Sequence, residues 1–290
     1  MNYRHHYHAG NYADVFKHAL LLQLVRGMQR KEKGFLYLDT HAGRGGYDLS
    51  ATTLLPDGRE RPPEFPQGIG RFWDATGLPA PLADYVATVR AFNERRGVAA
   101  GELTYYPGSP WIAQSLLRAQ DRAALCELRA DDAEALEIDF GRTANAVVHT
   151  MDGYTAVKAM LPPPEKRALV LIDPPFESAT EFADILTALR DGLKRFPSGV
   201  FAVWYPITER ARSEAFLQDL LALAPPPALV AELRIAAEHS AVRMKGCGLL
   251  VLNPPWRIDE EFRAVLPELV RRLGIDDGAF GRVSWLVPEK

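Results

Sequence analysis

The sequence has few cysteines and no long apolar run, and each absence excludes a class of protein. Only two of the 290 residues are cysteines, Cys126 and Cys247. They lie far apart in apolar, strand-like surroundings with no metal-ligand spacing around either, so we expect two buried free thiols and a reducing, cytoplasmic location. No apolar run approaches the roughly 20 residues that span a bilayer, and the N-terminus lacks the apolar region of a secretory signal. We therefore expect no membrane partner.

An excess of basic charge is also missing. The formal net charge is −3 and the pI is about 6.2, which excludes a globally basic nucleic-acid binder. The charge is uneven, however, because residues 1–33 hold six Lys or Arg against two Asp or Glu, a local net charge of +4, together with four histidines. Such a patch is compatible with phosphate contacts and equally with an ordinary solvated helix face. The histidines have no acid or cysteine at ligand spacing, so we predict no metal site.

The most informative stretch runs Ala168-Leu-Val-Leu-Ile-Asp-Pro-Pro-Phe176. Its apolar part predicts a buried strand, because it is short, partly β-branched and followed by two prolines, which lack a backbone donor. Asp173 and Phe176 then lie at the carboxyl end of a strand, where open α/β sheets bind their ligands. An acid, two prolines and an aromatic ring in this place are typical of amino-group methyltransferases. The alternative role for Asp173 is a helix cap.

A second strand-and-turn pattern is found at Phe35-Leu-Tyr-Leu-Asp-Thr-His-Ala-Gly-Arg-Gly-Gly46. A strand that runs into Asp39 and a glycine-rich turn predicts the first half of a nucleotide-binding βα unit. Gly43 and Gly45 permit a ligand to approach the backbone more closely than a Cβ would allow.

The remaining pattern predicts a single domain over residues 1–290. A helix capped by Asn11 precedes the first strand. From about 50 to 103 the α/β alternation stops, and prolines alternate with two helical stretches over a length too great for a loop. Because the alternation resumes afterwards, we predict a small helical insertion there. Near the C-terminus, Ala228–Ile235 and Gly248–Asn253 indicate a pair of strands joined by a loop.

Further candidates for ligand binding follow along the chain. Ser109 precedes Pro110 at the start of a predicted helix, and helix capping explains it as well as ligand binding does. Glu127 ends the second predicted strand of the sheet, where a carboxylate can accept from both ribose hydroxyls. Asp152 and Gly153 follow the third such strand. Asp152 can reach an adenine amino group or cap the next helix, and Gly153 permits close approach.

A second tetrad, Asn253-Pro-Pro-Trp256, is chemically as suitable as the first. Topology separates the two, because ligands bind where the strand order reverses, beside the turn after the first strand. Asp173 ends the fourth strand and should lie beside Gly43 and Gly45. Asn253 ends a strand of the antiparallel pair, toward the edge of the sheet. We therefore predict catalysis at Asp173 and a structural turn at Asn253.

The chemistry that Asp173 suits is methylation of an exocyclic adenine nitrogen. That nitrogen is a poor nucleophile because its lone pair is delocalised into the ring. A site that accepts both of its N–H bonds, from the Asp173 carboxylate and the Pro174 carbonyl, favours an sp³ nitrogen with an exposed lone pair. The two prolines hold the carbonyl in a fixed direction, and Phe176 offers a face for stacking of the base.

Together these motifs resemble a known family, the bacterial 23S ribosomal RNA adenine-N6 methyltransferases of the RlmJ type. The matching segments span nearly the whole chain, and the N-terminal segment is far more specific than the tetrad. They are Tyr3-Arg-His-His-Tyr-His-Ala-Gly-Asn-Tyr-Ala-Asp-Val-Phe-Lys-His18, Tyr37-Leu-Asp-Thr-His-Ala-Gly43, Tyr105-Tyr-Pro-Gly-Ser-Pro110, Ile172-Asp-Pro-Pro-Phe176, Trp204-Tyr-Pro206, Leu252-Asn-Pro-Pro-Trp256 and Val283-Ser-Trp285.

The resemblance implies an α/β, Rossmann-like class I methyltransferase fold. We expect a mostly parallel seven-stranded sheet with a terminal antiparallel pair and a small helical insertion. The family also implies S-adenosylmethionine as the methyl donor and a flipped adenine of 23S ribosomal RNA as the target. Separately, we expect the chain to act as a monomer. Asp173, Pro174 and Phe176 form the catalytic tetrad with Pro175. Where this chain has Phe176 the family usually has tyrosine, so stacking is kept and a hydroxyl is lost.

The site residues of the family carry over to matching positions in this sequence. Tyr3 would touch the RNA, and we predict that the aromatic and cationic N-terminal segment closes over the cofactor. The implied cofactor contacts are His18, His41, Ser109, Glu127, Asp152, Gly153 and Asp173.

Three other functions remain open on the sequence. A DNA adenine-N6 methyltransferase would carry the same tetrad. A nicotinamide-dependent oxidoreductase would account for the first βα unit but not for Asp-Pro-Pro-Phe. A non-catalytic RNA-binding module would use the basic N-terminal region and bind RNA without any cofactor.

Overall fold

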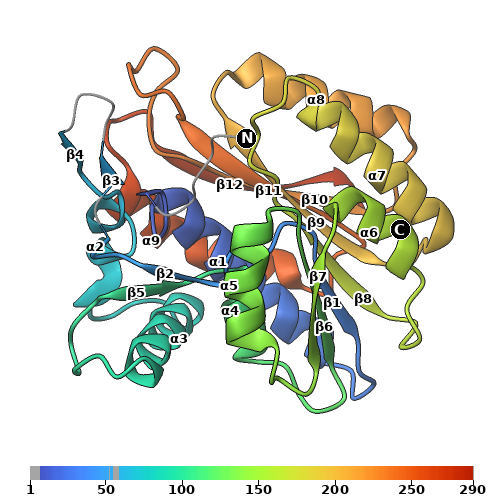
Figure 1. Cartoon of the computed structure of the whole chain (residues 1–290). Coiled ribbons are helices and arrows are strands. Elements are labelled where there is room, and N and C mark those ends of the chain that lie inside the picture. Colours follow the sequence, from blue (N-terminus) through green and yellow to red (C-terminus); the bar gives the residue numbers. More distant parts are fainter. Residues whose placement is uncertain (1–6, 52, 55–58, 290) are drawn as a thin grey trace.

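An eight-stranded sheet organises the computed structural model, which describes residues 7–51, 53–54 and 59–289. The strand order is β12-β10-β11-β9-β8-β1-β6-β7 (Figure 1). The strands are β1 (Leu36–Asp39), β6 (Arg122–Glu127), β7 (Ala146–Thr150), β8 (Ala168–Ile172), β9 (Val200–Ile207), β10 (Ala228–Arg234), β11 (Gly246–Leu252) and β12 (Phe280–Val287).

Neighbouring strands from β7 to β9 pair in parallel, whereas β11 runs antiparallel to both β9 and β10. This confirms the mostly parallel α/β fold and the antiparallel pair. The sheet has eight strands where seven were expected, because the apolar run near Val283 extends over residues 280–287 and pairs with β10. β11 lies inside the sheet, so the expectation that Asn253 lies toward its edge is wrong.

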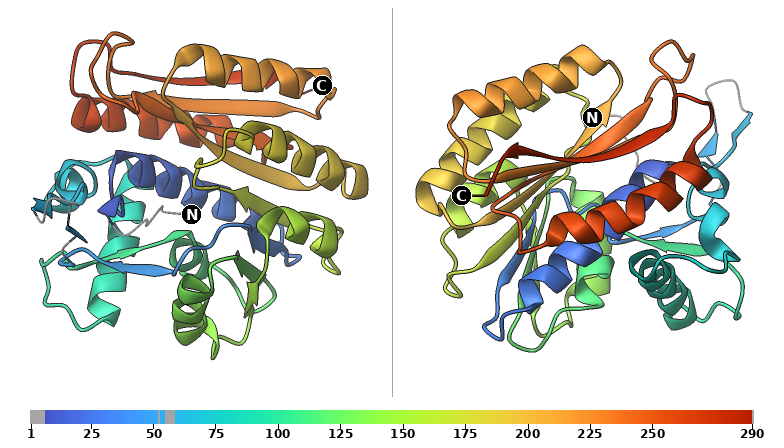
Figure 2. Two further views of the ribbon diagram at one scale, coloured as in Figure 1. Left: turned by 45° about the horizontal axis from the view of Figure 1, so that its top comes forward. Right: turned by 180° about the vertical axis from the view of Figure 1, so that it is seen from behind.

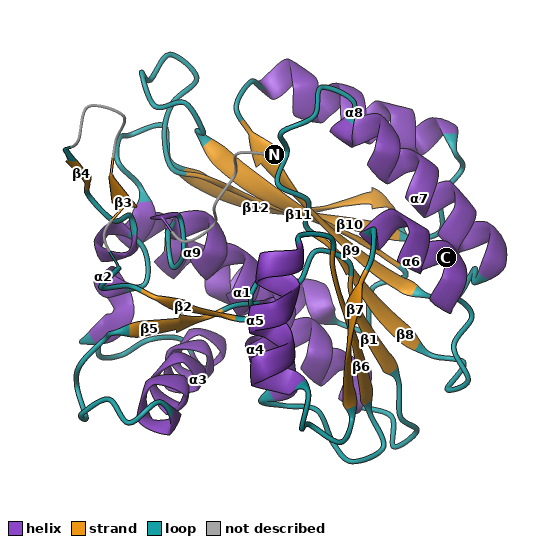
Figure 3. Cartoon of the chain, in the orientation of Figure 1, coloured by secondary structure: helices purple, strands orange, loops and turns teal. Residues whose placement is uncertain are grey.

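Helices cover both faces of the sheet, as Figures 2 and 3 show. Alternate residues of β1 enter different cores: Tyr37 belongs to one cluster, and Leu36 and Leu38 to the other. Burial on both faces explains why the parallel strands read as continuous apolar runs. One layer consists of α1 (Tyr12–Gln29), α4 (Ser109–Gln114), α5 (Ala130–Phe140) and α9 (Ile258–Leu273), and the other of α6 (Gly153–Met160), α7 (Glu181–Arg195) and α8 (Arg210–Ala222).

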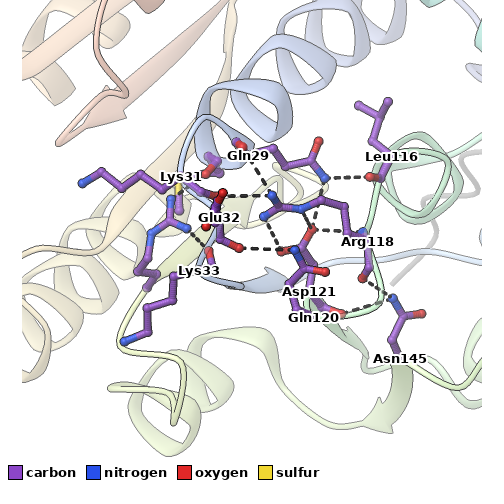
Figure 4. Close-up of polar contacts among 11 residues, drawn as sticks. Gln29, Lys31, Glu32, Lys33, Leu116, Arg118, Gln120, Asp121 and Asn145 are labelled. Atoms are coloured by element: carbon purple, nitrogen blue, oxygen red, sulfur yellow. Dashed lines mark hydrogen bonds and ion pairs between the residues drawn. The ribbon is translucent and has the colours of Figure 1, made fainter.

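Both ends of α1 are fixed by hydrogen bonds. The side chain of Asn11 caps the helix as predicted, and its Oδ1 accepts from Ala13 N at 2.9 Å and Asp14 N at 3.0 Å. At the other end, Arg118 donates to the Gln29 carbonyl, and the Gln29 amide reaches Asp121 at 3.1 Å (Figure 4). The Gln29 carbonyl, which has no partner within the helix, is satisfied in this way, and Arg167 donates to the Met28 carbonyl before it. This helix, with both ends fixed, bears the buried charged side chains of Asp14 and Lys17.

The segment between β1 and β6 contains more strand than expected. The two expected helical stretches are present, and two small two-stranded sheets, β2–β5 and β3–β4, were not expected. The division into one domain over 1–290 with an insertion at 50–103 stays a prediction. The elements of this segment are β2 (Gly46–Asp48), β3 (Thr53–Leu54), β4 (Glu60–Arg61), the 3₁₀ helix η2 (Phe65–Gln67), α2 (Gly70–Trp73), α3 (Ala80–Arg95) and β5 (Tyr105–Pro107).

Two expectations from composition can be checked against this fold. Cys126 and Cys247 are both buried and unbridged, as expected. Among the helices that the structure describes, none is long and apolar enough to cross a membrane.

Candidate active site

The candidate residues gather at the carboxyl edge of the parallel strands. β1 ends at Asp39, whose partners are Leu125 on β6 and Leu171 on β8. Glu127 and Asp173 each come two residues after the residue that pairs with Asp39. They therefore lie just beyond the end of β1, one on each side of that strand. The order β6-β1-β8 is the point where the strand order reverses, which is where such sheets bind ligands.

Asp173 belongs to a buried charge cluster that includes a residue of α1. The Nζ atom of Lys17 lies 2.5 Å from Asp173 Oδ2 and 3.0 Å from Asp14 Oδ1. The side chains of Lys17 and Asp14 are only 6% and 2% exposed. Burial disfavours the charged ammonium, but the two carboxylates outweigh this effect and raise the pKa of Lys17 well above its ordinary value. Lys17 is thus a firmly charged partner of Asp173.

Sequence reasoning did not single out Lys17 as a site residue. A signal was available, because Asp14 and Lys17 stand at i and i+3 on a helix whose other residues are mostly apolar. Charges that are buried in this way are paired, and at this spacing Asp14 and Lys17 can pair with each other. Only the packing of α1 beside β8 adds Asp173 to the cluster.

Aromatic rings surround the tetrad. Phe176 has a φ of +50°, a conformation that bulky residues rarely adopt. Its ring contacts those of Phe182 at 5.1 Å and Trp204 at 5.7 Å between centroids. Lys17 Nζ lies 6.0 Å from the centroid of the Trp204 ring. These contacts fix an aromatic wall beside the Asp173 carboxylate, which suits a planar base.

The glycine turn after β1 is held by Glu127. Gly43 and Gly45 have φ values of +59° and +83°, which side chains other than glycine rarely adopt. Glu127 Oε2 accepts from Gly43 N at 2.9 Å, and Oε1 accepts from Arg129 N at 2.8 Å. Burial raises the pKa of Glu127. Each carboxylate oxygen keeps a second lone pair, so Glu127 can still accept from ribose hydroxyls.

His18 and Ser109 come from α1 and α4, which pack against each other on one face of the sheet. His18 is buried on α1, and its Nδ1 lies 2.8 Å from the Tyr106 hydroxyl. The expectation that Ser109 caps α4 is wrong, because Gly108 is the N-cap residue and no side-chain cap bond forms. The buried Ser109 hydroxyl instead lies close to Asp39, where it partly offsets the rise that burial causes in the pKa of that carboxyl.

Asp152 and Gly153 have structural functions at the start of α6. The Asp152 carboxylate accepts from Thr155 N at 2.7 Å and so caps the helix. A Cβ on Gly153 would lie 2.0 Å from the carbonyl oxygen of Thr40, so close packing against the turn after β1 requires glycine here. Neither function prevents a cofactor contact, and that role stays a prediction for both residues.

The second tetrad lies at the opposite edge of the sheet. Leu252, the last residue of β11, pairs with Phe201 near the beginning of β9. Asn253 Nδ2 donates to the carbonyls of Pro197 and Gly199, both at 2.8 Å, and Trp256 is 70% exposed. Asn253 therefore holds a turn, far along the strands from Asp173.

The predicted RNA contact of Tyr3 concerns the N-terminal end of the chain. Tyr3 and the N-terminal segment up to residue 6 lie outside the described residues. The described chain begins at Tyr7, whose ring lies 3.4 Å from the Arg61 guanidinium carbon. Within the described ranges, no group of three or more His, Cys, Asp or Glu side chains could hold a metal ion.

Asp39 gives a prediction about stability. It is completely buried, and burial raises the pKa of its carboxyl to about 6 from an ordinary value of 3.8. Ionised Asp39 thus costs folding free energy above pH 6, so Asp39→Asn should increase the free energy of unfolding at pH 8 by on the order of 2–3 kcal/mol. The gain should shrink as the pH falls from 6 toward 4, because the wild-type carboxyl becomes neutral. Urea unfolding at pH 8 and pH 4.5 measures both values, and a gain independent of pH would contradict the argument.

Comparisons with known proteins extend over almost all of the chain. Residues 32–287 match the family model described as "Ribosomal RNA large subunit methyltransferase D, RlmJ". The chain is 39% identical over 289 residues to proteins named "Ribosomal RNA large subunit methyltransferase J" from Escherichia coli and Haemophilus influenzae, with 100% of each chain covered. Its fold matches the crystal structure of protein LPL1258 from Legionella pneumophila with a TM-score of 0.85 and 33% identity, covering 96% of this chain and 98% of that one.

Proposed function

This chain belongs to the RlmJ family of ribosomal RNA large subunit methyltransferases, and we propose that it methylates the N6 amino group of one adenine in 23S ribosomal RNA. S-adenosylmethionine is the methyl donor. The observation that supports this function best is the position of Asp173 beside the glycine turn, paired with Lys17 and flanked by aromatic rings.

The residues at the strand ends fit the cofactor. The left-handed Gly43 and Gly45 form a turn that a Cβ would obstruct, since a Cβ on Gly43 would lie 2.5 Å from the Tyr47 hydroxyl. Along the edge, Asp152 follows β7, Glu127 ends β6 and His41 follows β1. We assign them in that order to the adenine, the ribose and the amino-acid end. His18, Ser109, Gly153 and Asp173 complete the proposed set.

The chain's own residues prepare the target nitrogen for attack. The bound cofactor supplies an electrophilic methyl group on a sulfonium. Lys17 occupies Oδ2 of Asp173, which leaves Oδ1 to accept an N–H of the adenine amine while the Pro174 carbonyl accepts the other. As the nitrogen becomes cationic, Asp173 holds and then takes its proton. The rings of Phe176 and Trp204 hold the base in plane.

The finer features of the function follow from the same proposal. Ribosomal RNA is the partner, the chain acts as a monomer, and the reaction takes place in the cytoplasm. Tyr3 touches the RNA, and the N-terminal segment closes over the bound cofactor.

Two measurements test the proposed function. Mass spectrometric mapping of 23S ribosomal RNA from cells that lack the protein should show one adenine without its N6-methyl group. The purified protein should restore that methyl group on protein-free RNA and should leave duplex DNA unmodified, because RNA presents looped bases and 2′-hydroxyls. Methylation of DNA but not of RNA would contradict the proposal, as would an unchanged map.

A further inference from the structure

A hydrogen bond and a ring contact connect the start of α7 to His41 in the turn after β1. Glu181, the first residue of α7, is only 8% exposed, and its Oε1 accepts from the Tyr154 hydroxyl at 2.6 Å. The Tyr154 ring meets the His41 ring edge to face, with 5.2 Å between centroids. α6 and α7, which carry Tyr154 and Glu181, lie side by side in Figure 1. None of the steps described above uses Tyr154 or Glu181.

The tautomer of His41 follows from its neighbour. The Thr40 hydroxyl donates its single proton to the Leu171 carbonyl at 2.8 Å, so it can only accept from His41 Nδ1, also at 2.8 Å. Nδ1 therefore carries the proton, and Nε2 presents a lone pair. Burial lowers the pKa of His41 to about 4, so the ring is neutral near pH 7. Nε2 has no hydrogen-bond partner in the part of the chain that the structure describes.

We propose that Tyr154 and Glu181 are positioning residues that aim the Nε2 lone pair of His41 at the ammonium group of S-adenosylmethionine. An acceptor lone pair with a fixed direction suits an N–H donor, and the His41 ring has two fixed contacts, the Thr40 hydroxyl at Nδ1 and the ring of Tyr154. His41 follows β1, and β1 lies between β6, which ends at the proposed ribose-binding Glu127, and β8, which Asp173 follows. The amino-acid end of the cofactor reaches this position under the proposed function, on which the inference rests.

The same turn of α7 also supports the base site. Phe182, next to Glu181, contacts the Phe176 ring. The first turn of α7 thus contacts both sides of the site. Glu181 bonds to Tyr154, which contacts His41, and Phe182 contacts Phe176 beside the proposed base site. The buried carboxylate of Glu181 is therefore part of a support that serves both sides of the site.

Calorimetric titration of the full chain with two probes tests the inference. S-adenosylhomocysteine carries the ammonium, whereas 5′-methylthioadenosine lacks the whole amino-acid end. Tyr154→Phe keeps the ring but removes its hydroxyl, so it should weaken S-adenosylhomocysteine binding roughly five- to tenfold and change 5′-methylthioadenosine binding less than twofold. In methylation assays the KM for S-adenosylmethionine should rise while kcat stays within twofold. Glu181→Gln can still accept from Tyr154 and should bind both probes like the wild type.

A matched control is available at a second buried tyrosine. Tyr205 donates to Glu232 Oε1 at 2.9 Å, and both residues are buried. Tyr205→Phe removes the same kind of bond and should lower thermal stability without changing the affinity for either probe. Equal binding of S-adenosylhomocysteine by Tyr154→Phe and wild type would overturn the inference, as would an equal loss for both probes. If the wild type binds neither probe, the proposed function itself fails.

Discussion

Asp173→Ala is expected to lower kcat for adenine methylation by about a thousandfold, because the variant lacks the group that accepts the N–H bond and then the proton of the target amine. Binding of S-adenosylhomocysteine should change only a few fold, since Glu127, His41 and the glycine turn remain in place. Single-turnover methyl transfer to RNA together with titration of the cofactor product measures both quantities. Full activity in this variant would remove Asp173 from the mechanism.

The second tetrad provides the control for this experiment. The tetrad Asn253-Pro-Pro-Trp256 offers a polar group, two prolines and an aromatic ring. The Asn253 amide, however, already donates to the carbonyls of Pro197 and Gly199. Asn253→Ala leaves two carbonyls without their donor and should lower the free energy of unfolding by about 1–3 kcal/mol. Its kcat should match the wild type. A loss of kcat in Asn253→Ala with normal stability would contradict the proposal, because it would place the reaction at Asn253 and not at Asp173.

Lys17→Met is expected to have the largest effect on stability. The change leaves the buried carboxylate of Asp14 and the partly buried carboxylate of Asp173 without their shared ammonium, and breaking a buried pair in this way costs about 3–5 kcal/mol. Methylation should fall as well, because Asp173 loses the hydrogen-bonded partner that orients its carboxylate. Equilibrium unfolding in urea and kcat under saturating cofactor measure the two effects.

Two further variants separate charge from packing. Lys158→Met removes a surface ion pair with Asp191, in which Lys158 is 55% exposed, and should change stability by less than about 1 kcal/mol. Adding Asp14→Asn to Lys17→Met removes one uncompensated charge and should recover part of the stability but not the activity. Wild-type stability in Lys17→Met would show that the cluster contributes nothing.

The pH dependence of this cluster has a definite sign. The pKa of Lys17 is raised in the folded protein, so its contribution is complete below the ordinary lysine value of 10.5. That contribution is lost as the pH rises through the higher folded value. The difference in stability between the wild type and Lys17→Met should therefore stay constant from pH 7 to 10 and decrease only above that range.

The sequence by itself determined the strands of the parallel sheet, the position of Asp173 and the family. Short apolar runs that end in acid, glycine or proline carry this information locally, since burial on both faces requires continuous apolar residues and proline ends a strand. The choice between the two tetrads also followed from strand order. The expectation that Asn253 lies toward the edge of the sheet was wrong, because β11 pairs with both β9 and β10 and so lies inside the sheet.

Only the tertiary structure decided which distant side chains meet. Lys17 reaches Asp173 across 156 positions, and Tyr154 reaches Glu181 across 27, because α1 packs beside β8 and α6 beside α7. A sequence pattern reports whether a residue is buried on its own element, but not which neighbour satisfies its charge. The pairing of buried polar groups is a property of packing between elements, and at this site it determines how the carboxylate of Asp173 is held.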